Sequence, residues 1–217
     1  MRRLFYWFTL WFVKKTASPD MEIIVTHLVL SDSPSNTVDV GFLHGRAPGD
    51  DNPPLFDLAA SGVANNLLLN GHEGTGFGKH DLSVWTRRLT DRKVKPEQIH
   101  AFKPSDNTAQ EAREMIAYAK AQGWKSAVIL AQPHQVFRCM ACHITAMQKA
   151  NYWMRVYCSY PKNCNWFEPT CGSQGLNLMQ RWQHIALERS RIHKYIGQDS
   201  ATFEEIFEYY KNRDGIA

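Results

Sequence analysis

The sequence predicts an α/β protein with a doubly wound, mainly parallel sheet of about five strands, a Rossmann-like fold followed by C-terminal helices. Short apolar runs alternate along the chain with segments of helical periodicity, as in strands joined by crossover helices. The run at residues 127–131 contains no polar residue, which is typical of a strand buried on both faces. Polar or glycine residues follow each run, where the strands of a parallel sheet would end.

The first 37 residues are predicted to lie outside the Rossmann-like domain, which is expected to span residues 38–217. Residues 4–13 form an aromatic, apolar run between pairs of basic residues. They are too few to cross a bilayer, so they are expected to cover the domain. A peripheral membrane contact through this run and an export signal are the alternatives. Residues 16–37 are interpreted as a linker, in which residues 22–30 would form an edge strand or a helical turn.

Within the domain, helices are expected where apolar residues recur on one face, and strands where short apolar runs end in polar or glycine residues. The last helix illustrates the first pattern, because Phe203, Ile206, Phe207 and Tyr210 follow a helical period and predict a docking face. The predicted strands are residues 38–43, 66–69, 99–102, 127–131 and 152–157. The predicted helices are residues 53–63, 81–92, 108–122, 134–150, 176–196 and 202–212.

The helix at residues 108–122 has the clearest boundaries. Thr108 and Glu111 have the spacing of a capping box, in which each side chain satisfies a backbone N–H of the first turn. Gly123 follows the last apolar residue and favours the left-handed conformation that ends a helix.

Composition limits the classes of function. A chain of 217 residues suits one domain with a sizeable core. The net charge of +4 is small and its basic residues are scattered among acids, so no nucleic-acid partner is expected. Five cysteines are an odd number, which disfavours a complete disulfide framework and favours reduced thiols in the cytoplasm.

The middle of the chain also carries a resemblance. The pattern Ser105-x-Asn107-Thr108-x-x-Glu111, a helix, Gly-Trp-Lys, an apolar strand and then His134-x-x-x-Arg138 resembles the YdcF/SanA/ElyC family, closest to its soluble YdcF-like branch. That family has a Rossmann-like domain of unknown function. The resemblance implies S-adenosylmethionine as the ligand, and it also links the chain to cell-envelope work.

Ligands of open parallel sheets bind outside the carboxyl ends of the strands, so the residues there are the predicted site. The loop before residue 108 would offer backbone N–H groups to an anion, and an arginine one helical turn beyond His134 would pair with Glu111 or clamp a phosphate or carboxylate. His134 is the predicted general acid or base, because its ordinary pKa lies near neutrality. Glu111 is the second predicted catalytic residue, unless it only completes the capping box. The predicted ligand-binding residues are Gly45, Asn70, Gly71, Glu73, Ser105, Asn107, Thr108 and Arg138.

Two further patterns in the sequence resemble cofactor sites. Metal donors follow three strands, at His44, His72, Glu73 and His134, but they lie on separate loops, so no metal is expected. Residues 139–143 match the haem-attachment pattern Cys-x-x-Cys-His, but they fall inside a predicted helix, so no haem is expected.

Three functions follow from these observations. The first is binding of a nucleotide-like small molecule such as S-adenosylmethionine, with a transferase reaction as its extension. The second is a non-catalytic, envelope-associated interaction protein. The third is a metal-assisted hydrolase or phosphatase.

Overall fold

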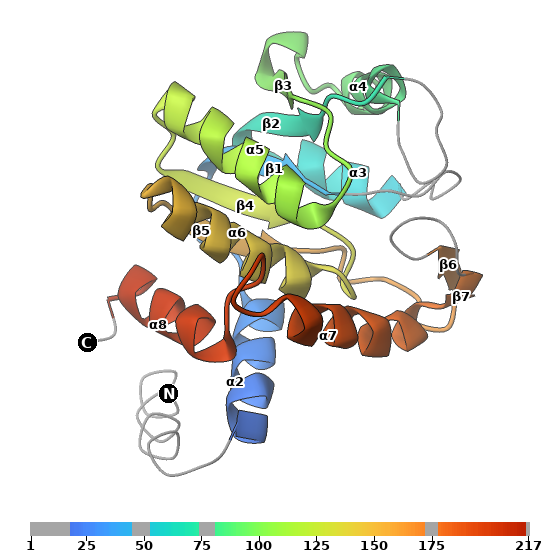
Figure 1. Cartoon of the computed structure of the whole chain (residues 1–217). Helices are drawn as coiled ribbons and strands as arrows, with labels where there is room; N and C mark the ends of the chain where they lie inside the picture. Colours follow the sequence, from blue (N-terminus) through green and yellow to red (C-terminus); the bar gives the residue numbers. More distant parts are fainter. Residues whose placement is uncertain (1–17, 45–52, 74–80, 172–177, 216–217) are drawn as a thin grey trace.

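The computed structural model describes residues 18–44, 53–73, 81–171 and 178–215. Their centre is a five-stranded parallel sheet in the order β3-β2-β1-β4-β5 (Figure 1). The strands are β1 (Val38–Leu43), β2 (Ala64–Asn70), β3 (Ile99–Phe102), β4 (Ser126–Leu130) and β5 (Arg155–Ser159). The chain runs outward from β1 to β3 and then crosses back to β4, so the strand order reverses between β1 and β4. This confirms the predicted doubly wound fold.

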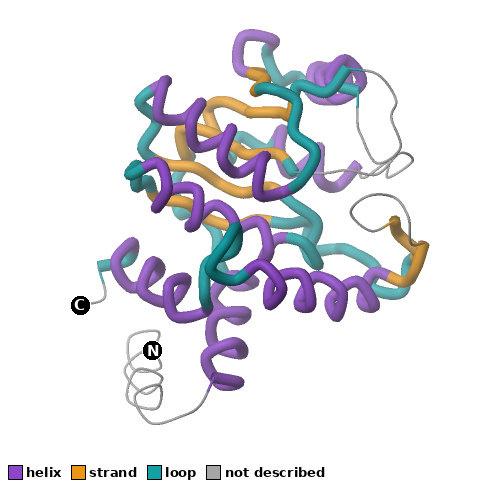
Figure 2. Tube along the Cα trace, in the orientation of Figure 1, coloured by secondary structure: helices purple, strands orange, loops and turns teal. Residues whose placement is uncertain are grey.

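Helices cover both faces of the sheet (Figure 2). One face packs against α3 (Pro53–Ala60) and α4 (Leu82–Thr90), and the other against α5 (Thr108–Gln122) and α6 (Val136–Ala150). The alternation of side chains along each strand divides the core accordingly. Phe42 of β1 belongs to the core under α5 and α6, whereas its neighbour Leu43 belongs to the core under α3 and α4.

The segment predicted as a linker is a helix, α2 (Ser18–Ser31). Val25 and Val29 are fully buried in the same core as α5 and α6, and α2 contacts α6, α8 (Phe203–Arg213) and β5. The linker prediction was therefore wrong. The segment is rich in β-branched residues, which have modest helix propensity, and contacts with the rest of the domain decide its conformation.

The long helix predicted at residues 176–196 is also corrected. Its first part is strand β7 (Leu178–Gln180), which pairs antiparallel with β6 (Pro169–Cys171). A 3₁₀ turn, η2 (Arg181–Gln183), leads into α7 (His184–Tyr195). Backbone bonds from η2 back to the segment before β6 hold this arrangement. Helical periodicity alone could not reveal a strand pairing made across residues 172–177.

The remaining elements agree with the prediction to within a few residues, and a short 3₁₀ turn, η1 (Pro96–Gln98), precedes β3. The cap of α5 differs from the prediction. Asn107 is the N-cap, and its Oδ1 accepts a hydrogen bond of 2.9 Å from the backbone N–H of Gln110. Gly123 ends the helix in the left-handed region as predicted. Because Asn107 caps the helix, the Glu111 side chain is left to point into the protein.

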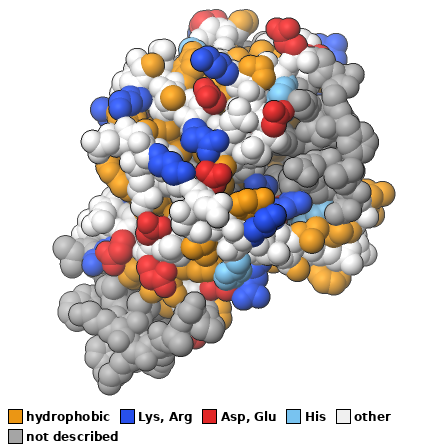
Figure 3. All heavy atoms as spheres, in the orientation of Figure 1, with side chains coloured by type: hydrophobic (Ala, Val, Ile, Leu, Met, Phe, Trp, Pro, Cys, Tyr) orange, Lys and Arg blue, Asp and Glu red, His pale blue; other side chains and the backbone are white. Residues whose placement is uncertain are grey.

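The described surface agrees with the composition. Lys and Arg side chains are interspersed with Asp and Glu on the face drawn in Figure 3. Among the described residues, no helix combines the length and the apolar character needed to cross a bilayer. The aromatic run at residues 4–13 lies outside the described residues.

Candidate functional site

A buried polar network ties the ends of β1 and β2 to the start of α5. The Glu111 carboxylate lies at its centre, with Oε2 at 3.1 Å from Nδ1 of His44 and Oε1 accepting a 3.0 Å hydrogen bond from Nδ2 of Asn70. Asn70 also donates to the backbone oxygen of Ser105 at 2.9 Å and accepts from its N–H at 3.1 Å. The predicted convergence of these strand-end residues is confirmed. The network fixes the loop that leads into α5.

Gly71 and Glu73 were predicted to bind ligand, and neither lines the pocket described below. The N–H of Gly71 donates to the backbone oxygen of Phe102 at 2.9 Å, and a Cβ on this residue would lie only 2.3 Å from that oxygen. The close packing of two strand ends therefore explains why a residue without a Cβ atom occupies this position. Glu73 is exposed, and Gly45 lies outside the described residues.

His134 does not have the properties expected of a general acid or base. Its side chain is buried and stacks on His184, with ring centroids 5.1 Å apart, and neither ring nitrogen has a hydrogen-bond partner among the described residues. Burial, followed by the charges of His184, Arg181 and Arg138, lowers the pKa of His134 to about 3. The sequence shows the ordinary pKa of a histidine but not its burial, so this lowered pKa could not be predicted from it.

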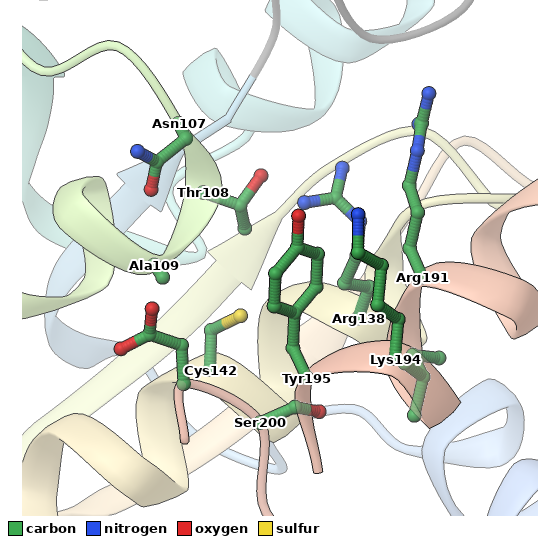
Figure 4. A pocket seen from close by; sticks show the side chains of 11 residues that line it. Asn107, Thr108, Ala109, Arg138, Cys142, Arg191, Lys194, Tyr195 and Ser200 are labelled. Atoms are coloured by element: carbon green, nitrogen blue, oxygen red, sulfur yellow. The ribbon is translucent and has the colours of Figure 1, made fainter.

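Other predicted residues meet at a pocket of about 470 Å³ between the start of α5, α6 and the end of α7 (Figure 4). Asn107 and Thr108 line it from α5, and Arg138 lines it from α6. Residues of α7 and of the turn after it line the opposite side of the pocket. These are Arg191, Ile192, Lys194, Tyr195, Asp199 and Ser200. The pocket thus joins segments that are distant in the sequence.

Arg138 is the central charge of this pocket. Its Nε donates to Glu188 of α7, and not to Glu111 as one prediction had it. Burial opposes the charge, but the Glu188 carboxylate raises the pKa of Arg138, so the guanidinium stays charged. The side chain is 13% exposed, and its two terminal nitrogens have no hydrogen-bond partner among the described residues. Those N–H groups are available to a ligand.

The other charges give the pocket a positive balance. Lys194 forms no ion pair with any described residue, and its ammonium lies 5.1 Å from the centroid of the Tyr195 ring. Asp199 lines the pocket as an acid, and it binds Arg113 at 2.9 Å and Lys149 at 3.3 Å. In addition, the N–H groups of the first turn of α5 have no acceptor within the helix. An anionic group would be stabilised here.

The Cys-x-x-Cys-His motif belongs to the core. The thiols of Cys139 and Cys142 are buried, which raises their pKa, to about 11 for Cys142. His143 stacks on Phe42, its Nδ1–H donates to the backbone oxygen of Cys139 at 2.8 Å, and burial lowers its pKa to about 3. Such thiols are poor nucleophiles at neutral pH. The motif packs α6 against the sheet.

The candidate metal donors stay apart. Among the described residues, no group of three or more His, Cys, Asp or Glu side chains is arranged to hold a metal ion. His72, one of these candidates, instead donates from Nε2 to the backbone oxygen of Ser105 at 2.7 Å.

Sequence reasoning missed Lys194, Asp199 and Ser200 as lining residues. No local pattern marks them, because they reach the pocket only when α7 folds across α6. Neither the family models nor the curated proteins with which the chain was compared give a match.

Proposed function

We propose that this protein binds an anionic, nucleotide-like small molecule at the carboxyl edge of its sheet. The observation that carries the proposal is the Arg138 guanidinium, which is mostly buried and whose two terminal nitrogens, without a hydrogen-bond partner in the described part of the chain, face a pocket of about 470 Å³. Small-molecule sites have volumes in this range and sit at this edge of open parallel sheets.

S-adenosylmethionine is the ligand that the YdcF-like resemblance suggests. Its carboxylate would meet Arg138 and the first turn of α5, and the ring of Tyr195 offers a flat surface for a base. Nucleotides and nucleotide sugars would use the same contacts through phosphate. A transferase reaction extends this proposal. The free thiols of Cys139, Cys142, Cys158 and Cys164 support a reducing setting such as the cytoplasm.

A thermal-shift panel tests the proposal. It contains S-adenosylmethionine, mono-, di- and triphosphates of adenosine, and nucleotide sugars. A true ligand at a hundredfold excess over its Kd should stabilise the protein by about 2.7 kcal/mol, or raise Tm by roughly 5–10 °C.

The Arg138→Met variant keeps the length of the side chain and removes its donors, so it should lose the shift. Arg92→Met is the matched control, because Arg92 pairs with Asp57 outside the pocket. A panel without a hit, or a shift that survives in Arg138→Met, contradicts the proposal.

A further inference from the structure

One buried carboxylate accepts hydrogen bonds from two arginines beside the pocket. Glu188 of α7 accepts from Nε of Arg138 through Oε2, and from Nη1 of Arg191 through Oε1 at 2.6 Å. The Glu188 side chain is 4% exposed and does not line the pocket itself. Both of its oxygens are thus engaged by cations from two different helices.

Stability alone gives little reason for such a cluster. Buried ion pairs are often no better than well-packed apolar residues, because both charges must leave water. Arg138 and Arg191 share this one carboxylate, and the Arg138 side chain is only 13% exposed, so positive charge gathers in a partly buried place. Lys194 adds to this positive charge, since it forms no ion pair with a described residue. An anion bound in the pocket would neutralise part of this positive charge.

The donors around the pocket outnumber the oxygens of a carboxylate. Figure 4 shows the polar ends of Thr108, Arg138, Lys194 and Tyr195 directed toward the same part of the pocket. Arg138 alone offers two terminal nitrogens in a planar fork, which matches two oxygens of one anion. A phosphate has three terminal oxygens and a charge between −1.5 and −2 at neutral pH. It can therefore use donors that a carboxylate would leave unpaired.

We propose that the pocket binds a phosphate group and that Glu188 is the positioning residue that holds Arg138 for it. Glu188 accepts a hydrogen bond from Nε of Arg138, and this contact keeps the two terminal nitrogens of the guanidinium directed toward the pocket. This inference rests on the proposed function and names the chemical class of its ligand.

The negative charge of Glu188 allows a positioning role to be distinguished from a simple effect of net charge on phosphate affinity. If only net charge mattered, Glu188→Gln would remove a negative charge near the anion and tighten phosphate binding. If positioning matters, the same change releases Arg138 and weakens binding. The two views predict opposite outcomes for one variant.

The experiment measures binding of inorganic phosphate and of ADP by isothermal titration calorimetry at constant ionic strength, with acetate as the carboxylate probe. The wild-type protein should bind phosphate at least about tenfold more tightly than acetate. Glu188→Gln should weaken phosphate and ADP binding by about tenfold or more, the scale of loss seen when the hydrogen-bond partner of a metal-binding residue is removed.

Glu22→Gln is the matched control. Glu22 also pairs with an arginine of α7, Arg189, but neither residue lines the pocket. Its affinity for both probes should equal that of the wild type. Far-UV circular dichroism and Tm establish that each variant is folded.

If Glu188→Gln does not fold, Glu188→Asp decides the question. It keeps the charge but retracts the carboxylate, so positioning predicts weaker phosphate binding and net charge predicts no change. Tighter or unchanged binding in the folded variant overturns the role of Glu188. Phosphate binding no tighter than acetate binding overturns the phosphate class, while a hit with S-adenosylmethionine would leave the proposed function standing.

Discussion

Removing one partner of the buried ion pair between Asp32 and Arg213 should cost this protein more stability than most single substitutions do. Asp32 follows α2 and Arg213 ends α8, and their side chains are 6% and 5% exposed. Arg213 donates to both carboxylate oxygens, from Nη1 at 2.8 Å and from Nη2 at 3.0 Å. The hydroxyl of Tyr210 and the backbone N–H of Cys158 donate to the same carboxylate at 3.0 and 2.9 Å. One carboxylate thus joins α2, β5 and α8.

The perturbation is Arg213→Met. Methionine keeps most of the apolar stem but removes the guanidinium, whose central carbon lies 4.4 Å from the ring centroids of Tyr157 and Tyr210, and it leaves the Asp32 charge buried with neutral donors only. Removing one partner of a buried pair costs about 3–5 kcal/mol. Because two neutral donors remain on Asp32, the free energy of unfolding should fall by about 3 kcal/mol, the lower end of that range.

The assay is urea unfolding followed by tryptophan fluorescence and by far-UV circular dichroism, whose coincidence would support a two-state analysis. Asp57→Asn is the control, since its pair with Arg92 is even shorter, at 2.6 Å, but Asp57 is 65% exposed. That change should cost less than about 1 kcal/mol. Adding Asp32→Asn to Arg213→Met should restore part of the loss, because the stranded charge disappears. Equal losses in Arg213→Met and Asp57→Asn would refute this reasoning.

Two further predictions concern the buried histidines and Gly71. His134 and His143 have a pKa of about 3 in the folded protein, below the ordinary value of 6.5, so between these values the unfolded chain binds more protons. Stability should therefore fall as pH decreases from 6.5 toward 3, by up to about 1.4 kcal/mol per pH unit for each histidine. Urea unfolding at several pH values measures this slope, and His143→Phe should reduce it; an unchanged slope would count against the buried neutral ring. Gly71→Ala should destabilise by about 1–3 kcal/mol, because its Cβ would approach the backbone oxygen of Phe102 to 2.3 Å. A Tm equal to that of the wild type would contradict this close contact.

Much of the fold could be predicted from the sequence because its signals are local. The apolar run at β4, the glycine after α5 and the helical period of α8 each reflect the preferences of neighbouring residues. The alternation of such segments is enough to predict a parallel sheet and the edge at which its loops meet. The residues at that edge, including Asn70 and Ser105, were therefore predictable as neighbours.

The site itself depended on contacts that no local pattern contains. Arg138 pairs with Glu188, fifty residues away along the chain, and not with the acid predicted beside it. Residues 18–31 are a helix because Val25 and Val29 are buried against other elements. His134 loses its ordinary pKa because the folded chain excludes water from it. Local sequence patterns identified most strands and helices around the sheet and the edge where its loops gather, but not helix α2 or strand β7. Which charges meet and which are buried follows from the folded arrangement, because both depend on distances between segments that are far apart in the chain.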